Sequence, residues 1–267
     1  MRDDLGNRMK EKYEVRTQTY LPRRTYAIIR VDGKAFHTWV RSAQCIKPFD
    51  KNLIDAMNQT AIFMCENIQG AQLAYTQSDE ISILITDFER ENSEAWFDYN
   101  VQKMVSISAS LATAGFDRSY SGCQSKLPAL FDARVFVIPD PVEVENYFIW
   151  RQKDAERNSI QSVAQSLYSH KELDGKGCSD LNEMIWQKGQ NWNNFTAWEK
   201  RGRVAIKVSE PKTVEYTNPK EGKVVKVVER KVWKTIEDTP LFTSDRAFLR
   251  TVIPHLGYNE KDAVKGE

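Results

Sequence analysis

Two acidic positions in this sequence could hold divalent metal ions. Asp32 and Gly33 end a run of β-branched and aromatic residues, 25–31, which predicts a buried strand. Asp79 and Glu80 stand at the polar centre of an otherwise apolar hairpin pattern. If the strand and the hairpin are neighbours in one sheet, their carboxylates meet at one edge. Magnesium needs only one or two protein carboxylates, and two such ions can clamp the attacking and leaving oxygens of a phosphoryl transfer.

Other polar residues near these positions could bind phosphate. Lys34, His37 and Lys47 follow Asp32 closely enough to line a triphosphate pocket, and Ser78 could donate its hydroxyl to a phosphate oxygen. The alternative is a plain one, because acidic residues at turns are commonly solvated, lysines commonly lie on surfaces, and a histidine can be structural. Spacing alone therefore leaves both interpretations open.

The elements that must position these residues follow the order β-α-β-β-α-β up to residue 138. This is the ferredoxin-like arrangement that polymerase palms and nucleotide cyclases use. Apolar residues recur at helical spacing after Asp50, with Gly70 where a helix would end, and again from Ala95 to Ala114, ending at Gly115. The remaining segments are a strand at 25–31, a loop at 38–48, a hairpin at 73–85 and a strand at 134–138.

The chain changes character after residue 138. Residues 142–168 favour a helix, 174–177 a loop, 203–208 a strand and 224–236 an exposed hairpin. Pro211 and residues 219–222 are expected to bracket a flexible loop, and the charged tail 260–267 to be frayed. We predict an α+β fold with a palm-like catalytic domain, 1–138, and a C-terminal helical and β-hairpin domain, 139–267.

Composition excludes several classes of protein. Apolar residues make up 41% and charged residues 28%, as in an ordinary soluble protein. No apolar run is long enough to span a bilayer, and the N-terminus lacks a signal core, so we expect a cytoplasmic protein without membrane contact. The four cysteines show no C-x-x-C spacing and the three histidines are dispersed, which argues against structural zinc.

The net charge of +1 gives no global field for nucleic acid, so any phosphate-binding surface must be local. Residues 220–234 carry six basic and two acidic residues, and residues 200–203 form a second basic cluster. Such clusters neutralise phosphates without reading sequence, although a solvated hairpin face would look the same. The candidate nucleic-acid contacts are Lys200, Arg201, Arg203, Lys223, Lys226 and Arg230.

Several sequence runs resemble those of the tRNAHis guanylyltransferase family. The runs RVDGKAFH at 30–37 and AYTQSDEIS at 74–82 are similar to its two signature segments. The runs FDARV at 131–135 and YFIWRQ at 147–152 also resemble that family, as do Lys188-Gly189 and KRG at 200–202. The resemblance covers roughly residues 3–210 and keeps the motifs in order.

The resemblance implies a palm-like enzyme that adds nucleotides in the 3′–5′ direction. ATP first activates the 5′-monophosphate of a tRNA, and the 3′-hydroxyl of an incoming nucleotide such as GTP then attacks it. Two Mg²⁺ ions would be held by Asp32, Asp79 and the carbonyl of Gly33, while Glu80 would ligate indirectly or orient a neighbour. The partners would be the 5′ end and acceptor stem of tRNA, within a homotetramer. The implied nucleotide-binding residues are Arg30, Lys34, Ala35, Phe36, His37, Lys47, Ser78, Arg151 and Asn158.

One departure from the family bears on the substrate. Eukaryotic members carry a histidine followed by Ile-Asn-Asn-Leu-Tyr-Asn after the Trp-Arg-Gln segment, and that histidine is linked to recognition of the histidine anticodon. This chain has ERNSIQS at 156–162, which keeps only Asn158. The pattern resembles the bacterial and archaeal guanylyltransferase-like branch and favours template-dependent repair of 5′-truncated tRNA over addition of an extra guanosine to tRNAHis. The sequence is also compatible with a palm-fold nucleotide cyclase and with a non-catalytic tRNA-binding module.

Overall fold

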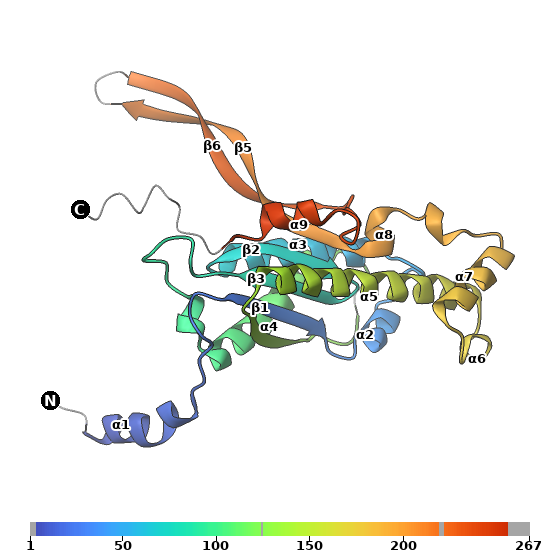
Figure 1. The fold of residues 1–267 in the computed structure, drawn as a ribbon, viewed down its shortest axis with the longest axis horizontal. Coiled ribbons are helices and arrows are strands. Elements are labelled where there is room, and N and C mark those ends of the chain that lie inside the picture. Colours follow the sequence, from blue (N-terminus) through green and yellow to red (C-terminus); the bar gives the residue numbers. More distant parts are fainter. Residues whose placement is uncertain (1–3, 124, 219–221, 256–267) are drawn as a thin grey trace.

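One antiparallel sheet of six strands organises the molecule (Figure 1). The computed structural model describes residues 4–123, 125–218 and 222–255. Neighbouring strands follow the order β4-β1-β3-β2-β5-β6. The bounds are β1 Tyr26–Gly33, β2 Ala71–Gln77, β3 Glu80–Ile85, β4 Phe131–Ile138, β5 Arg203–Asn218 and β6 Gly222–Ile236. The first four strands have the predicted ferredoxin-like order, and the α+β palm-like fold class is confirmed.

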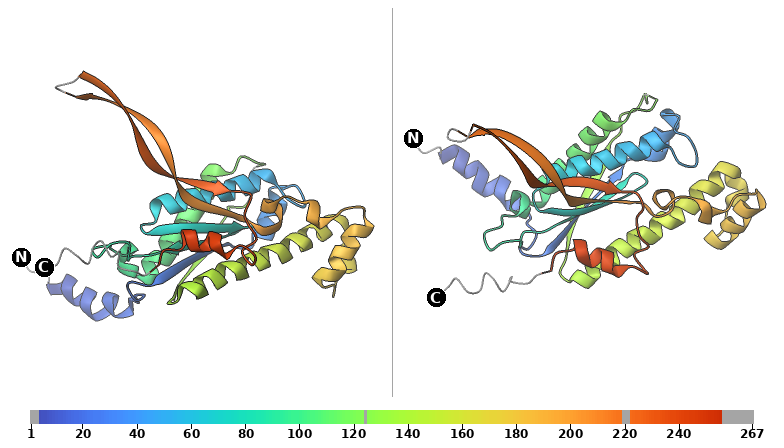
Figure 2. Two further views of the ribbon diagram at one scale, coloured as in Figure 1. Left: turned by 45° about the horizontal axis from the view of Figure 1, so that its top comes forward. Right: turned by 90° about the horizontal axis from the view of Figure 1, so that it is seen from above.

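Helices cover both faces of the sheet (Figure 2). One face packs on α3 (Lys51–Asn67) and α4 (Val101–Ser119), and the other on α5 (Pro141–Leu167) and α9 (Arg246–Val252). Side chains alternate along β1, so that Ile29 faces the first pair of helices and Ile28 the second. Because both faces are buried, β1 reads as a nearly continuous apolar run.

Side chains at the helix N-termini set where the long helices begin. Asp50 accepts a hydrogen bond from the amide of Leu53 at the start of α3, and Asn100 does the same for Lys103 at the start of α4. Asp140 caps α5. The predicted helices after Asp50 and at 142–168 are confirmed, as is the loop at 174–177 between α6 (His170–Leu173) and α7 (Cys178–Gln187).

The loop expected at 38–48 is wrong over its first residues, where the chain forms α2 (Phe36–Ser42). Phe36 and Trp39 lie one turn apart on this helix, and both rings pack on Phe116 of α4 with centroid distances of 5.4 and 5.1 Å. Burial of these two aromatic rings outweighs the weak helix propensity of the segment. The local pattern does not reveal this helix, because Phe116 is far from the segment in the sequence.

The helix expected at 95–114 is shifted, because α4 begins at Val101 and continues past Gly115. A Cβ on Gly115 would lie 2.9 Å from Phe63 Cδ1 and 3.3 Å from Thr60 Cγ2. Gly115 therefore allows close packing of α3 against α4 and does not end the helix.

The strand expected at 203–208 is too short. β5 continues to Asn218 and pairs with β6 as a long arm that projects from the body (Figure 1). Pro211 lies within β5, paired with Glu229, so it does not border a loop. The predicted tail 260–267 lies outside the described residues.

The domain boundary predicted at residue 138 stays a prediction. Strand β5, which follows that boundary, pairs with β2 and continues the sheet. None of the helices among the described residues is long and apolar enough to cross a membrane.

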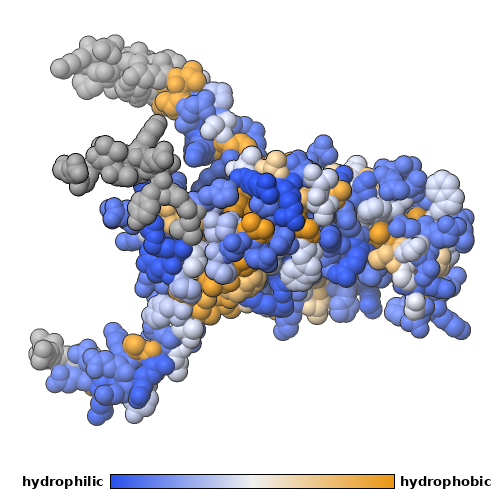
Figure 3. Space-filling view, viewed as in Figure 1, coloured by the Kyte–Doolittle hydropathy of each residue, from blue (hydrophilic) through white to orange (hydrophobic). Residues whose placement is uncertain are grey.

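The face shown in Figure 3 is mostly hydrophilic, with scattered apolar patches.

Candidate active site

Strand register brings the two predicted metal-ligating carboxylates together. Asp32 lies at the end of β1, opposite Glu80 of β3. Asp79 occupies the two-residue turn between β2 and β3, after Ser78, whose φ of 47° is in the left-handed region. The hairpin tip therefore stands beside the end of β1, as the sequence predicted.

Gly33 shows how close this approach is. A Cβ built on Gly33 would lie 2.6 Å from Asp79 Oδ2 and 2.4 Å from Phe36 Cδ2. The carboxylate of Asp79 thus rests against the backbone of β1 in space that only glycine leaves open. The backbone of Gly33 and the carboxylates of Asp32 and Asp79 form one cluster.

The electrostatics of this cluster favour a cation. Burial, followed by the nearby charge of Asp32, raises the pKa of Asp79 to about 6. The pKa of Asp32 is raised as well, first by burial and then by Asp132, while Arg134 opposes the shift. Among the described residues, no basic side chain forms an ion pair with Asp79. Two crowded carboxylates without a paired cation on Asp79 are the ligand set that Mg²⁺ prefers.

Glu80 is held differently from the two aspartates. Its Oε1 and Oε2 accept hydrogen bonds from Arg151 Nε and Nη2 of α5 at 2.8 and 2.6 Å. The two side chains are only 10% and 6% exposed, and Arg151 also contacts Asp154. In this arrangement both oxygens of Glu80 are occupied, so the pair fixes the hairpin tip to α5.

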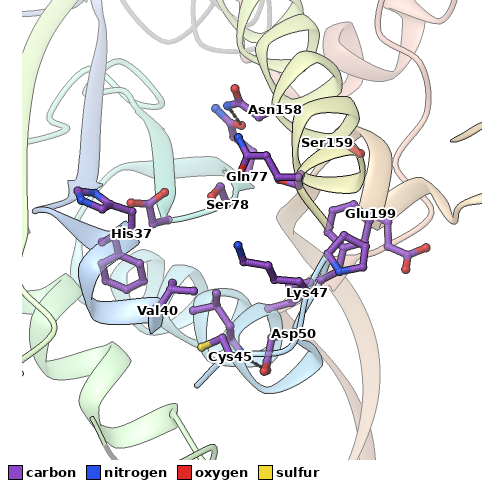
Figure 4. A pocket seen from close by; sticks show the side chains of 18 of the residues that line it. His37, Val40, Cys45, Lys47, Asp50, Gln77, Ser78, Asn158, Ser159 and Glu199 are labelled. Atoms are coloured by element: carbon purple, nitrogen blue, oxygen red, sulfur yellow. Dashed lines mark hydrogen bonds between the residues drawn. The ribbon is translucent and has the colours of Figure 1, made fainter. Parts of the chain in front are cut away.

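Two cavities meet at the carboxylate cluster. The larger has a volume of about 1000 Å³, and Lys47 points into it between His37 and the Asn158 side of α5 (Figure 4). The smaller has a volume of about 390 Å³ and lies against Arg30 and Trp150. Both cavities are lined by Asp32, Gln77, Ser78, Asp79 and Asn158.

The predicted nucleotide-binding residues divide between these cavities. The larger cavity is lined by Ala35, Phe36, His37, Lys47, Ser78 and Asn158. The smaller is lined by Arg30, Ser78, Arg151 and Asn158. Lys34 is exposed and lines neither.

The tRNA-binding role predicted for Arg203 stays a prediction. Its side chain is buried, with 3% of the residue exposed, and its Nε donates to Asn58 Oδ1 at 2.9 Å, so Arg203 lies in the wall of the larger cavity and not on an open basic surface. Lys200 and Arg201 are partly buried at α8 (Ala197–Arg201), and Lys200 lines the larger cavity. Arg230 is exposed on the arm, while the side chains of Lys223 and Lys226 lie outside the described part of the chain.

Sequence reasoning missed four residues that the fold adds to the site. Asp132 of β4 is paired with Asp32 of the neighbouring strand β1, and Arg134 Nη2 lies 4.0 Å from Asp32 Oδ2. Gln77 accepts a hydrogen bond from Asn158, and Trp150 borders the smaller cavity. All four residues lie in the runs that resemble the family, which was the available signal.

Paired carboxylates between two cavities suit a group transfer between two phosphate-bearing substrates. On an antiparallel β-α-β-β-α-β sheet they define a class, the palm-like nucleotidyltransferases.

Comparison with known proteins supports that class and names the family. The family model for tRNAHis guanylyltransferase matches residues 6–139. A bacterial tRNAHis guanylyltransferase-like protein in complex with ATP superposes with a TM-score of 0.79 and 37% identity, over 94% of this chain and 100% of that chain. A bacterial tRNAHis guanylyltransferase-like protein in complex with GTP superposes with a TM-score of 0.76 and 37% identity, over 95% of this chain and 100% of that chain. The tRNAHis guanylyltransferase of Debaryomyces hansenii is 29% identical over 215 residues, 74% of this chain and 77% of that protein.

The chain belongs to the tRNAHis guanylyltransferase family. It is an enzyme that transfers nucleotidyl groups to tRNA.

Proposed function

We propose that the chain repairs the 5′ end of tRNA by template-dependent addition of nucleotides in the 3′–5′ direction. The observation that carries this proposal is the position of Asp32 and Asp79 at the boundary between two cavities. One cavity can take a nucleoside triphosphate while the other takes the RNA end that accepts it. The bacterial relatives whose complexes contain ATP and GTP support nucleotide binding here.

The residues around the cluster fit a magnesium site. Asp32, Asp79 and the carbonyl of Gly33 would hold two ions, in line with the raised pKa values of both aspartates. Mg²⁺ bound there would neutralise charge on the reacting phosphate oxygens. Lys47, which points into the larger cavity, binds triphosphate oxygens as a flexible point charge. Glu80 and Arg151 keep the turn that carries Asp79 in place.

Repair is favoured over guanosine addition to tRNAHis for two reasons. The sequence at 156–162 lacks the histidine motif linked to anticodon recognition. In addition, the 37% identical structures are bacterial guanylyltransferase-like proteins, whereas the curated tRNAHis guanylyltransferase of Debaryomyces hansenii is 29% identical. We also propose that the protein is cytoplasmic and forms a homotetramer. Analytical ultracentrifugation tests the oligomeric state directly.

One assay tests the proposed reaction. The protein is incubated with ATP, Mg²⁺, labelled GTP and a tRNA lacking its first 5′ nucleotide, with full-length tRNAHis in parallel. We expect label at the 5′ end of the truncated tRNA, incorporated faster than into tRNAHis. Asp32→Ala and Asp79→Ala should each reduce incorporation by at least about 100-fold, because both carboxylates would hold the ions that neutralise the reacting phosphates.

Three different results of this assay would contradict the proposal. Faster labelling of full-length tRNAHis would establish guanosine addition as the main reaction. A small cyclic product without labelled RNA would indicate a cyclase. Undiminished incorporation by the Asp32→Ala/Asp79→Ala double variant would exclude this site.

A further inference from the structure

Trp150 is placed unusually for an indole ring. It lies on α5 with 50% of its surface exposed, at the rim of the smaller cavity. Single exposed aromatic residues are common and need no special role. Trp150 differs because the same cavity is lined by Asp32 and Asp79.

The ring of Trp150 is held in place by a chain of contacts. The guanidinium carbon of Arg151 lies 4.4 Å from the ring centroid, and Tyr147 packs on the ring edge-on at 5.8 Å. Arg151 is itself fixed by the bidentate bond to Glu80. The ring is thus preorganised, so that little conformational entropy is lost when a planar group stacks on it.

Arg30 adds a cationic group to the same rim. Its guanidinium carbon lies 6.0 Å from the Trp150 centroid. Within the described part of the chain, no carboxylate lies within ion-pair distance of Arg30, although Asp32 and Glu80 are near enough to feel its charge. An aromatic surface beside an available guanidinium matches the two parts of a nucleotide, its base and its phosphate.

The two cavities differ in what they can admit. The larger cavity extends from the carboxylates past Lys47 and has room for a triphosphate. The smaller is bordered by the half-exposed Trp150. The end of a long RNA needs such an open rim, because the rest of the strand must continue into solvent, whereas a free nucleotide does not.

We propose that Trp150 is the stacking platform for the 5′-terminal base of the acceptor RNA, with Arg30 on its phosphate. This inference rests on the proposed function and assigns the smaller cavity to the RNA end. Trp150 therefore determines affinity for the RNA and leaves affinity for the incoming nucleotide unchanged.

The test uses full-length protein and a 5′-truncated tRNA with 2-aminopurine as its terminal base. Stacking on an aromatic ring quenches 2-aminopurine, so wild-type protein should lower its fluorescence, while a probe at the third nucleotide should change little. Trp150→Leu keeps apolar packing but removes the aromatic face, and Trp150→Phe retains it. Trp186→Ala, at an indole that is 62% exposed on α7, is the matched control.

We expect Trp150→Leu to abolish the quenching and to raise the KM for RNA by about 5- to 160-fold, the range for loss of one base–aromatic stack. The KM for GTP should stay constant, and Trp150→Phe and Trp186→Ala should behave almost as wild type. Bound RNA without quenching by wild-type protein would overturn the proposal, as would a Trp150→Leu variant that raises only the KM for GTP. Quenching reports RNA binding and is measured without nucleotide incorporation. Failure of this proposal is therefore distinguishable from failure of the proposed reaction, which the incorporation assay measures.

Discussion

The buried carboxylate of Asp79 destabilises the folded protein when it is ionised. Its carboxylate is largely buried beside Asp32, and its pKa is raised to about 6 from an ordinary 3.8. Between about pH 4 and 6 the folded protein therefore binds more protons here than the unfolded chain does. Stability from this group is present below pH 4 and is lost as the pH rises through 6.

At the residue scale, Asp79→Asn should therefore stabilise the metal-free protein while removing its activity. In EDTA at pH 8, we expect the free energy of unfolding to rise by about 3 kcal/mol, because the buried charge is gone. The gain should shrink as the pH falls from 6 towards 4. Urea denaturation of both proteins at pH 8 and pH 4.5 measures this, and an equal difference at the two values would contradict the assigned pKa shift.

At the scale of elements, the ion pair between Glu80 and Arg151 links the β2–β3 hairpin to α5. Both side chains are nearly buried, so the pair cannot be treated as a surface salt bridge. Burial raises the pKa of Glu80, and the charge of Arg151 offsets only part of that shift. Loss of Arg151 would leave an ionised carboxylate without its cation at the base of the β2–β3 turn.

Arg151→Met should cost about 3–5 kcal/mol of folding free energy at pH 8, the range for breaking one half of a buried pair. The cost should be smaller at pH 5, because protonated Glu80 needs no cation. The Glu80→Gln/Arg151→Met double variant should recover most of the loss. Lys51→Met, which breaks an exposed pair with Asp55, is the control and should cost less than about 1 kcal/mol. Additive losses in the double-mutant cycle would show that the two side chains are not coupled.

At the scale of the whole molecule, the β5–β6 arm extends well beyond the body (Figure 1). Arg230 and Lys231 are exposed on it, and Val227 is 69% exposed. A basic arm that projects from a nearly neutral protein can contact RNA phosphates without altering the catalytic centre.

Replacing Lys223, Lys226 and Arg230 with glutamine should therefore weaken tRNA binding without changing the KM for GTP. The slope of log affinity against log salt should fall by about 0.7–0.9 for each phosphate contact that is lost. Filter binding over a salt series gives this slope. The same exchange at Lys171, Lys176 and Lys188 is the charge-matched control, because these lysines lie in or next to α6 and α7, which are far from the arm (Figure 1). An unchanged slope would exclude the arm from RNA binding.

Local patterns in the sequence are enough to predict the elements that carry Asp32 and Asp79. The strand before Asp32, the hairpin around Asp79 and the helix after Asp50 follow from local apolar periodicity and from capping and turn residues. Their β-α-β-β-α-β order then limits the sheet to few arrangements, and the resemblance of the motifs indicated the family.

The contacts that these residues make depend on how the elements pack together, which local patterns do not reveal. Arg151, the partner of Glu80, is 71 positions away in the chain, and Asp132 lies beside Asp32 because of strand register. Arg203 is buried, although its charge predicted an exposed side chain in a basic cluster. The helix that continues through Gly115 likewise depends on Phe63 of its neighbour. Periodicity records which face of an element is apolar, but not which distant residue packs against it, because that choice depends on register and shape across the whole core.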